Sequence, residues 1–103
     1  GIGDVCGIPI CRTGGSATHQ GPVVVGNLIS ALDGKPLKGK FDGYTVCPIK
    51  TEYGKIILAE FNYEGIAPTI PFLDPAEPRF FWWAIDLYQL KPIYWYLMLR
   101  GWF

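Results

Sequence analysis

Apolar side chains recur at helical spacing in the first third of the chain. The positions that carry this pattern are Val24, Val25, Leu28, Ile29 and Leu32. Side chains repeated every three or four residues fall on one face of an α-helix, so the segment predicts a helix that is buried on one side. Gly34 follows directly and is typical of the position just beyond a helix C-terminus.

The stretch before this helix combines capping hydroxyls with small residues in Thr13-Gly14-Gly15-Ser16. At such a helix start, backbone N–H groups can approach a ligand, and acceptor oxygens and negative charge are favoured there. Pro22 comes further on and either kinks the helix or marks its true first turn. We expect residues 1–32 to run from a glycine-rich turn into this helix.

The middle of the chain has the composition of an antiparallel sheet. Its β-branched and aromatic residues predict two strands, Phe41 to Ile49 and Lys55 to Tyr63, with a hairpin turn at Glu52-Tyr53-Gly54. Four prolines then keep the chain irregular until about residue 76. An isolated hairpin is only marginally stable in water, so the sheet needs a neighbour to cover it.

The end of the chain is crowded with aromatic rings. Residues 79–103 hold 10 of the 16 aromatic residues: Phe80, Phe81, Trp82, Trp83, Tyr88, Tyr94, Trp95, Tyr96, Trp102 and Phe103. Two short helices fit, one from about Ala76 to Tyr88 and one opened by Pro92 and closed by Gly101. Trp and Tyr favour the headgroup level of a bilayer, so we expect a monotopic membrane anchor. An oligomer interface or a docking surface for other domains is the alternative.

Charge and cysteine content narrow the classes of protein. The 9 basic residues balance the 9 acidic ones without forming blocks, which argues against a nucleic-acid partner. Three cysteines without a signal-peptide pattern do not predict a secreted disulfide scaffold. The longest apolar runs, Phe80 to Ile85 and Ile93 to Leu99, fall short of the roughly 18 to 20 residues that span a bilayer. The chain can therefore at most lie on a membrane surface.

The start of the chain indicates a piece of a longer protein. It opens with Gly1-Ile2-Gly3-Asp4, without an initiator Met and without a strand leading into this strand-end motif. No Gly-x-Gly-x-x-Gly fingerprint for a dinucleotide diphosphate is present in the 103 residues. We expect this chain to be inactive by itself.

The segment around Cys47 carries a family resemblance. Residues 42–63 read DGYTVCPIKTEYGKIILAEFNY, and this closely resembles the C-terminal part of the sulfide:quinone oxidoreductases, membrane-bound, FAD-dependent members of the pyridine nucleotide-disulfide oxidoreductase superfamily. By composition alone, a strand cysteine is more often a small buried hydrophobic residue than a nucleophile. The resemblance implies instead that Cys47 is catalytic, as one of a redox pair beside the flavin whose other cysteine lies in the N-terminal half. In that family sulfide sulfur is added to the bridge, and two electrons pass through FAD to a quinone.

The resemblance also implies a flavin site. Gly3-Asp4 is similar to the Gly-Asp that ends a strand in this superfamily, where the carboxylate accepts a hydrogen bond from a flavin ribityl hydroxyl. The helix that follows would point its N-terminus at the pyrimidine side of the isoalloxazine and stabilise negative charge on the reduced ring. Arg12 stands where many relatives have Lys, so the resemblance implies a cation beside the flavin. That Arg12 is an ordinary loop cation is an equally weighted alternative. The residues assigned to FAD are Gly3, Asp4, Arg12, Thr13, Gly14 and Gly15.

The remaining candidates are weaker. Phe81 and Trp82 are the implied quinone-stacking residues. Cys6 and Cys11 depart from the small residues that are usual at these places; with Cys47 and His19 they could in principle bind a metal ion. We expect both cysteines to have an ordinary packing role. A local disulfide and a sulfur relay are the alternatives. We expect no bound metal ion. His19 is expected to be structural.

The resemblance runs from Gly3 to Trp102 and implies the overall organisation. The expected fold is an α+β fragment of an α/β flavoprotein with two dinucleotide-binding domains, made of one helix, a small antiparallel hairpin or sheet and two C-terminal amphipathic helices. Residues 1–40 would end the FAD-binding domain, residues 41–75 would carry the redox cysteine, and residues 76–103 would attach to the membrane.

The implied function is that of the C-terminal portion of a peripheral, monotopic enzyme that oxidises sulfide to sulfane sulfur or polysulfide and reduces a membrane quinone. Its expected partners are sulfide, quinone, the lipid surface, the N-terminal FAD-binding portion and further copies in a homo-oligomer. The alternatives are a non-catalytic anchoring or assembly module and a related sulfide or NADH dehydrogenase flavoprotein. The aromatic tail favours a lipid-soluble quinone over a water-soluble cytochrome as the electron acceptor.

Overall fold

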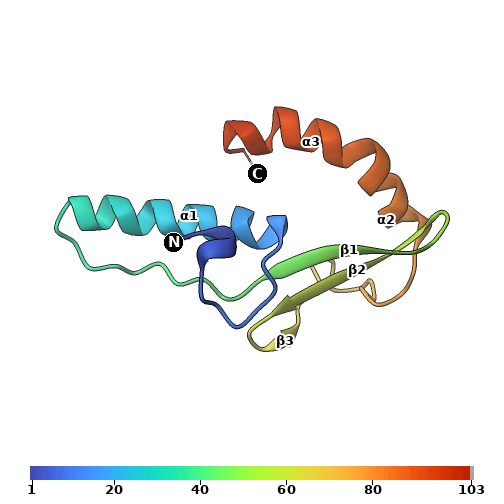
Figure 1. Cartoon of the computed structure of the whole chain (residues 1–103), viewed down its shortest axis with the longest axis horizontal. Helices are drawn as coiled ribbons and strands as arrows, with labels where there is room; N and C mark the ends of the chain where they lie inside the picture. Colours follow the sequence, from blue (N-terminus) through green and yellow to red (C-terminus); the bar gives the residue numbers. More distant parts are fainter. Residues whose placement is uncertain (103) are drawn as a thin grey trace. The chain divides into compact units, whose positions relative to one another are not determined.

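The first helix is present as α1, Gly14–Leu32, in the computed structural model of the chain (Figure 1). Thr13 is its N-cap, and Asp33 and Gly34, with φ of 66° at the glycine, end it as predicted. Pro22 lies inside the helix, so it does not mark the first turn. The structure describes residues 1–102, and Phe103, the last of the ten clustered aromatic residues, lies outside them.

The apolar face of α1 is not buried within this chain, contrary to expectation. Val24 is half-buried, Val25, Leu28, Ile29 and Leu32 are exposed, and the buried residues of the helix are instead polar, Ser16 and Gln20. The spacing identified the helix correctly. Burial depends on a neighbouring element, and nothing among residues 1–102 covers this face.

A three-stranded sheet follows in the order β1-β2-β3, with β1 at Thr45–Glu52, β2 at Lys55–Asn62 and β3 at Gly65–Ile66. β2 and β3 are antiparallel, with Phe61 opposite Ile66. The turn between β1 and β2 is Tyr53-Gly54, and the φ of 78° at Gly54 is a conformation that glycine adopts without strain. The predicted hairpin is confirmed, whereas β3 was not predicted.

β1 begins four residues later than predicted and ends three residues later. The reason is a turn around Gly43, which has φ of 86° and packs against the ring of Tyr63 so closely that a Cβ atom would overlap it. The side chain of Asp42 accepts a hydrogen bond from the backbone N–H of Tyr44, which closes the turn. Extended backbone therefore starts only at Thr45.

The aromatic tail forms α2 (Phe80–Ala84), a π-helical turn η2 (Ile85–Gln89), α3 (Leu90–Tyr96) and a 3₁₀ turn η3 (Met98–Arg100) (Figure 1). The prediction of a helix start at Ala76 is wrong, because Asp74 accepts a side-chain bond from the N–H of Ala76 in a turn. The expected break before Pro92 is also absent. Pro92 has no N–H to donate, and the wider π turn precedes it. Gly101, with φ of 72°, ends η3 as predicted.

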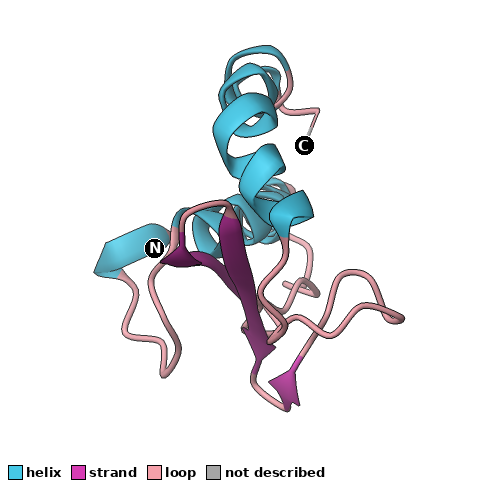
Figure 2. Cartoon of the chain, turned by 90° about the vertical axis from the view of Figure 1, so that its right-hand side faces the viewer, coloured by secondary structure: helices cyan, strands magenta, loops and turns pink. Residues whose placement is uncertain are grey.

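Two compact units make up the chain: residues 1–46 with 61–67, and residues 47–60 with 68 onward. In the second unit, Ile56 and Arg79 exchange backbone hydrogen bonds of 3.2 and 3.0 Å. Ile56 is 0% exposed and Trp82 9%, and they are the large apolar residues buried in the described chain. Loop connects β3 to α2 (Figure 2), as the prolines predicted.

The hairpin end of the second unit packs on the aromatic helix. The rings of Tyr53 and Trp83 have centroids 5.5 Å apart, and Lys50 Nζ lies 3.1 Å from a carboxylate oxygen of Asp86. In the loop that follows β3, the backbone N–H of Thr69 donates to the buried carboxylate of Glu60 at 3.1 Å. Among residues 1–102, no helix combines the length and the hydropathy that crossing a membrane requires.

Candidate functional site

Thr13 connects the N-terminus of α1 to the beginning of β1. Its Oγ1 accepts a hydrogen bond from the backbone N–H of Ser16 at 3.1 Å, as an N-cap does. The same oxygen lies 3.0 Å from Oγ1 of Thr45, a buried residue. Thr45 Oγ1 also contacts the carbonyl oxygen of Cys11 at 3.3 Å. The start of the helix, the start of the strand and the loop before the helix are thus held together by one pair of hydroxyls.

Gly15 lies against Val46, the second residue of β1. A Cβ atom at Gly15 would overlap the Val46 side chain, whereas a Cβ atom at Gly14 would meet nothing within 4 Å. The two adjacent glycines therefore have different roles. Gly15 lets the helix N-terminus approach the strand, and Gly14 leaves that N-terminus open, with the first N–H groups of the helix lacking partners inside it.

The N-terminal 3₁₀ turn η1, Gly3–Val5, is attached to α1 through Gln20. The N–H of Gly3 donates to Oε1 of the buried Gln20 at 2.7 Å, and the Cys6 thiol contacts the same oxygen at 3.9 Å. This leaves the carboxylate of Asp4 exposed on a turn that is fixed to the helix. The structure thus brings two of the sequence-predicted groups, Gly3-Asp4 and the start of α1, into one unit.

Gln20 and the polar face to which it belongs were not predicted from the sequence. Thr13, Ser16 and Gln20 follow one another at intervals of three and four residues and so lie on one side of α1. Ser16 donates from its Oγ to the carbonyl oxygen of Cys11 at 3.0 Å. The helical spacing of these polar residues could have predicted a shared face. The apolar pattern in the second half of the helix was more prominent and was used instead.

Arg12 closes the loop in front of the helix. Its Nε donates to the carbonyl oxygen of Cys6 at 3.1 Å, and the side chain remains exposed. This bond gives Arg12 a local role in the loop before α1. A role toward a ligand stays a prediction.

Cys47 is the third residue of β1 and is exposed, directly before Pro48. Cys11 is also exposed and Cys6 is half-buried, and none of the three forms a disulfide with another described residue. Within residues 1–102, no group of three or more His, Cys, Asp or Glu side chains is arranged to hold a metal ion. The structure therefore offers no support for the alternative three-cysteine, one-histidine site.

His19 contacts its own helix and a neighbouring ring. Its Nδ1 lies 3.0 Å from the carbonyl oxygen of Gly15, and its ring centroid lies 4.3 Å from that of Tyr44. Both contacts lie inside the first unit and connect α1 with the turn before β1. The structural role expected for His19 remains a prediction, which these contacts favour.

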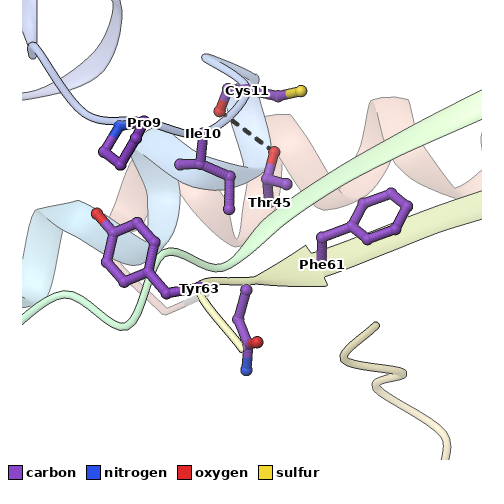
Figure 3. A pocket seen from close by; sticks show the side chains of 7 residues that line it. Pro9, Ile10, Cys11, Thr45, Phe61 and Tyr63 are labelled. Carbon is purple, nitrogen blue, oxygen red and sulfur yellow. Dashed lines mark hydrogen bonds between the residues drawn. The ribbon is translucent and has the colours of Figure 1, made fainter. Parts of the chain in front are cut away.

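An open hollow of about 590 Å³ lies beside the Thr45 hydroxyl (Figure 3). Its wall is mostly apolar and consists of Pro9, Ile10, Cys11, Thr45, Phe61, Asn62 and Tyr63. The sulfur of Cys11 points away from Pro9 and Ile10, and its carbonyl oxygen faces Thr45 (Figure 3). Apart from Cys11, these residues were expected only to form strand and loop, and no pattern in the sequence indicated this hollow.

The two residues expected to stack on a quinone differ in exposure. Phe81 is exposed, whereas Trp82 is buried, and their ring centroids are 5.0 Å apart. The indole Nε1 of Trp82 has no hydrogen-bond partner among the described residues. Phe81 is therefore the more accessible ring of the pair.

No protein-family profile matches the chain. Three proteins named mitochondrial sulfide:quinone oxidoreductase do: that of Dictyostelium discoideum is 43% identical over 99% of the chain, that of Schizosaccharomyces pombe 39% over 97%, and that of Mus musculus 34% over 98%.

The chain spans only about a quarter of the length of these relatives, between 22% and 23%. This share is consistent with the expected C-terminal portion. The small α+β arrangement of the chain is likewise compatible with a piece of a larger flavoprotein. Over nearly its whole length, the chain is thus related in sequence to the sulfide:quinone oxidoreductases.

Proposed function

We propose that this chain is the C-terminal portion of an FAD-dependent sulfide:quinone oxidoreductase, and that it supplies a redox cysteine, part of the flavin site and the membrane-facing quinone site. The observation that carries the proposal is the match of 97% to 99% of the chain to three proteins of that name. The rest of the FAD site and the second redox cysteine belong to the portion that these relatives have in addition.

The first unit has groups that fit a flavin. Asp4 offers an exposed carboxylate that can accept a hydrogen bond from a ribityl hydroxyl. The N-terminus of α1 offers N–H groups beside Gly14, where no side chain intrudes. When bound, FAD would accept two electrons from the sulfur centre and pass them on to the quinone. Gly3, Thr13 and Gly15 would hold this arrangement in place, and Arg12 would add a positive charge.

Cys47 is the thiol that we assign to sulfide chemistry. Hydrosulfide attacks the disulfide between Cys47 and its partner cysteine; one new S–S bond forms to the incoming sulfur, the original S–S bond breaks, and the other cysteine leaves as a thiolate. This reaction requires an accessible sulfur, and Cys47 is exposed on β1. Its strand begins at Thr45 and Val46, which pack against the start of α1.

The aromatic segment of the second unit is the proposed quinone and membrane site. Phe81 is exposed, and so are most of the large apolar residues that follow it up to Trp102. Such a surface is unusual for a water-facing monomer and typical of interfacial helices. We assign it to peripheral, monotopic attachment, with Phe81 and the neighbouring Trp82 at the quinone ring.

Substitution of the thiol tests the proposal. In the full-length protein, Cys47→Ser should abolish sulfide-dependent quinone reduction while FAD remains bound, because the serine hydroxyl forms no disulfide. Cys11→Ser is the matched control, since Cys11 is equally exposed, and it should keep full activity. A Cys47→Ser protein with parental turnover would refute the assignment. A parent protein that binds no flavin would favour the non-catalytic anchoring module.

A further inference from the structure

The charged side chains between Leu87 and Trp102 are all basic. Between Leu87 and Trp102 the sequence has two basic residues, Lys91 and Arg100, and no acidic residue. Asp86, just before this stretch, is only 13% exposed and is paired with Lys50 at 3.1 Å. Within residues 1–102, neither Lys91 nor Arg100 takes part in an ion pair.

Each of these two basic residues stands beside an exposed tryptophan. The guanidinium carbon of Arg100 lies 5.8 Å from the ring centroid of Trp102, which is 71% exposed. This distance is within the range of a cation–π contact. Lys91 and Trp95 are four residues apart in α3 and therefore lie on one face, and Trp95 is 56% exposed. We call these four residues the basic aromatic surface.

Further exposed apolar side chains lie in the same helical segment. They are Leu87, Tyr88, Leu90, Tyr94, Tyr96 and Leu99. Tryptophan and tyrosine favour the depth of the lipid headgroups, and the long stems of Lys and Arg allow their charges to reach the phosphates at that depth. The core of a protein–protein interface is enriched in aromatic residues and arginine but depleted of lysine, so Lys91 is the residue that favours lipid over a protein partner. The charge of the surface thus complements an anionic bilayer.

We propose that the basic aromatic surface binds anionic phospholipid headgroups and gives this protein a preference for negatively charged membranes. The proposal rests on the membrane attachment proposed above and adds a lipid class to it. Lys91 and Arg100 provide the electrostatic selectivity, while the aromatic and leucine side chains provide apolar burial that is independent of lipid charge.

Vesicle binding of the full-length protein tests this proposal. Vesicles of phosphatidylcholine alone are compared with vesicles that also contain phosphatidylglycerol, and bound protein is measured by co-sedimentation. The parent protein should bind the anionic vesicles more tightly, and added salt should reduce the difference by screening. The double variant Lys91→Gln, Arg100→Gln should lose this preference, by about fivefold for each charge removed. Its binding to neutral vesicles should not change.

The double variant Lys38→Gln, Lys40→Gln is the matched control. It removes the same charge from exposed lysines outside the helical segment, so it should keep the preference. Equal parental binding to both vesicle types would overturn the lipid preference and leave membrane attachment standing. The proposed lipid preference would also be overturned if the control variant lost the preference for anionic vesicles. The same holds if the Lys91 and Arg100 variant kept that preference. Absence of binding to any vesicle would overturn both the membrane attachment and the lipid preference. The catalytic proposal is tested separately, by sulfide-dependent reduction of a short-chain quinone.

Discussion

The hydroxyl oxygens of Thr13 and Thr45 lie 3.0 Å apart, so the N-cap of α1 and the first residue of β1 share one hydrogen bond. Thr45 is buried, and its Oγ1 also contacts the Cys11 carbonyl oxygen at 3.3 Å. Thr45→Val keeps the shape of the side chain but leaves Thr13 and Cys11 without this partner. We expect the full-length protein to lose about 1 to 3 kcal/mol of unfolding free energy, measured as a lower denaturation midpoint in urea.

The control for this variant is Thr18→Val. The Thr18 hydroxyl donates to the carbonyl oxygen of Gly14 within the same helix, at an exposed site, so its loss should change stability by a few tenths of a kcal/mol. If the two variants lowered the urea denaturation midpoint equally, the Thr13–Thr45 contact would contribute no more to stability than an exposed hydrogen bond within the helix.

Gly15 and Gly14 give a second prediction with its control built into the sequence. Gly15→Ala would place a methyl group into the Val46 side chain, and overpacking of this kind costs about 1 to 3 kcal/mol. Because Val46 directly precedes Cys47, the displaced strand should also change the rate at which Cys47, after reduction, reacts with an alkylating reagent. Gly14→Ala meets no atom within 4 Å. Its stability and thiol reactivity should remain parental, and a comparable loss there would contradict the packing argument.

Local signals explain what was predictable in this fold. The Thr13 cap and Gly34 mark the ends of α1, and Gly54 marks the hairpin turn, because each acts on its own few residues. The late start of β1 depends on Gly43 packing against Tyr63, twenty positions away. A contact between segments so distant in sequence has no local signature.

In the candidate site, too, local features were predicted from the sequence and contacts between distant residues were not. The Gly3-Asp4 turn and the start of α1 were predicted, and the structure brings them into one unit. Gln20, which holds them together at 2.7 Å from the Gly3 N–H, was not foreseen. The exposed apolar face of α1 shows why burial could not be predicted: helical spacing indicates which residues share a face, whereas burial depends on a neighbouring element that the spacing does not specify.

Asp4 provides a direct test of the flavin site. Asp4→Ala in the full-length protein should weaken FAD retention through loss of a charge-assisted hydrogen bond worth about 1.5 to 3 kcal/mol. The measurement is flavin content after gel filtration, followed by titration of the apoprotein with FAD. Asp33→Ala is the control, because Asp33 is an exposed carboxylate at the opposite end of α1, paired with Lys35. Unchanged flavin affinity in Asp4→Ala would mean that Gly3-Asp4 is unrelated to FAD.

The last prediction concerns a truncation of the aromatic C-terminal segment, and the contacts in the second unit determine the residue at which the truncated protein should end. Removing residues from 79 onward would also remove the Arg79–Ile56 backbone bonds, the buried Trp82 and the Lys50–Asp86 ion pair. Ending the full-length protein at Gln89 keeps these contacts and deletes only α3 and the residues after it. The deletion removes several exposed aromatic and leucine side chains, each worth about 1.5 to 3 kcal/mol when buried in a bilayer. The truncated protein should therefore leave the membrane without detergent.

Activity separates this role of the tail from a role in folding. The truncated enzyme should lose turnover with a long-chain quinone, which reaches the site from the bilayer, far more than with a short-chain, water-soluble quinone. Its thermal unfolding midpoint should stay close to the parental value, since the buried residues of the second unit remain. If the truncated protein still sediments with vesicles, the anchor lies elsewhere. A simultaneous fall in its molecular mass by light scattering would then assign these aromatic side chains to an interface between copies of the protein.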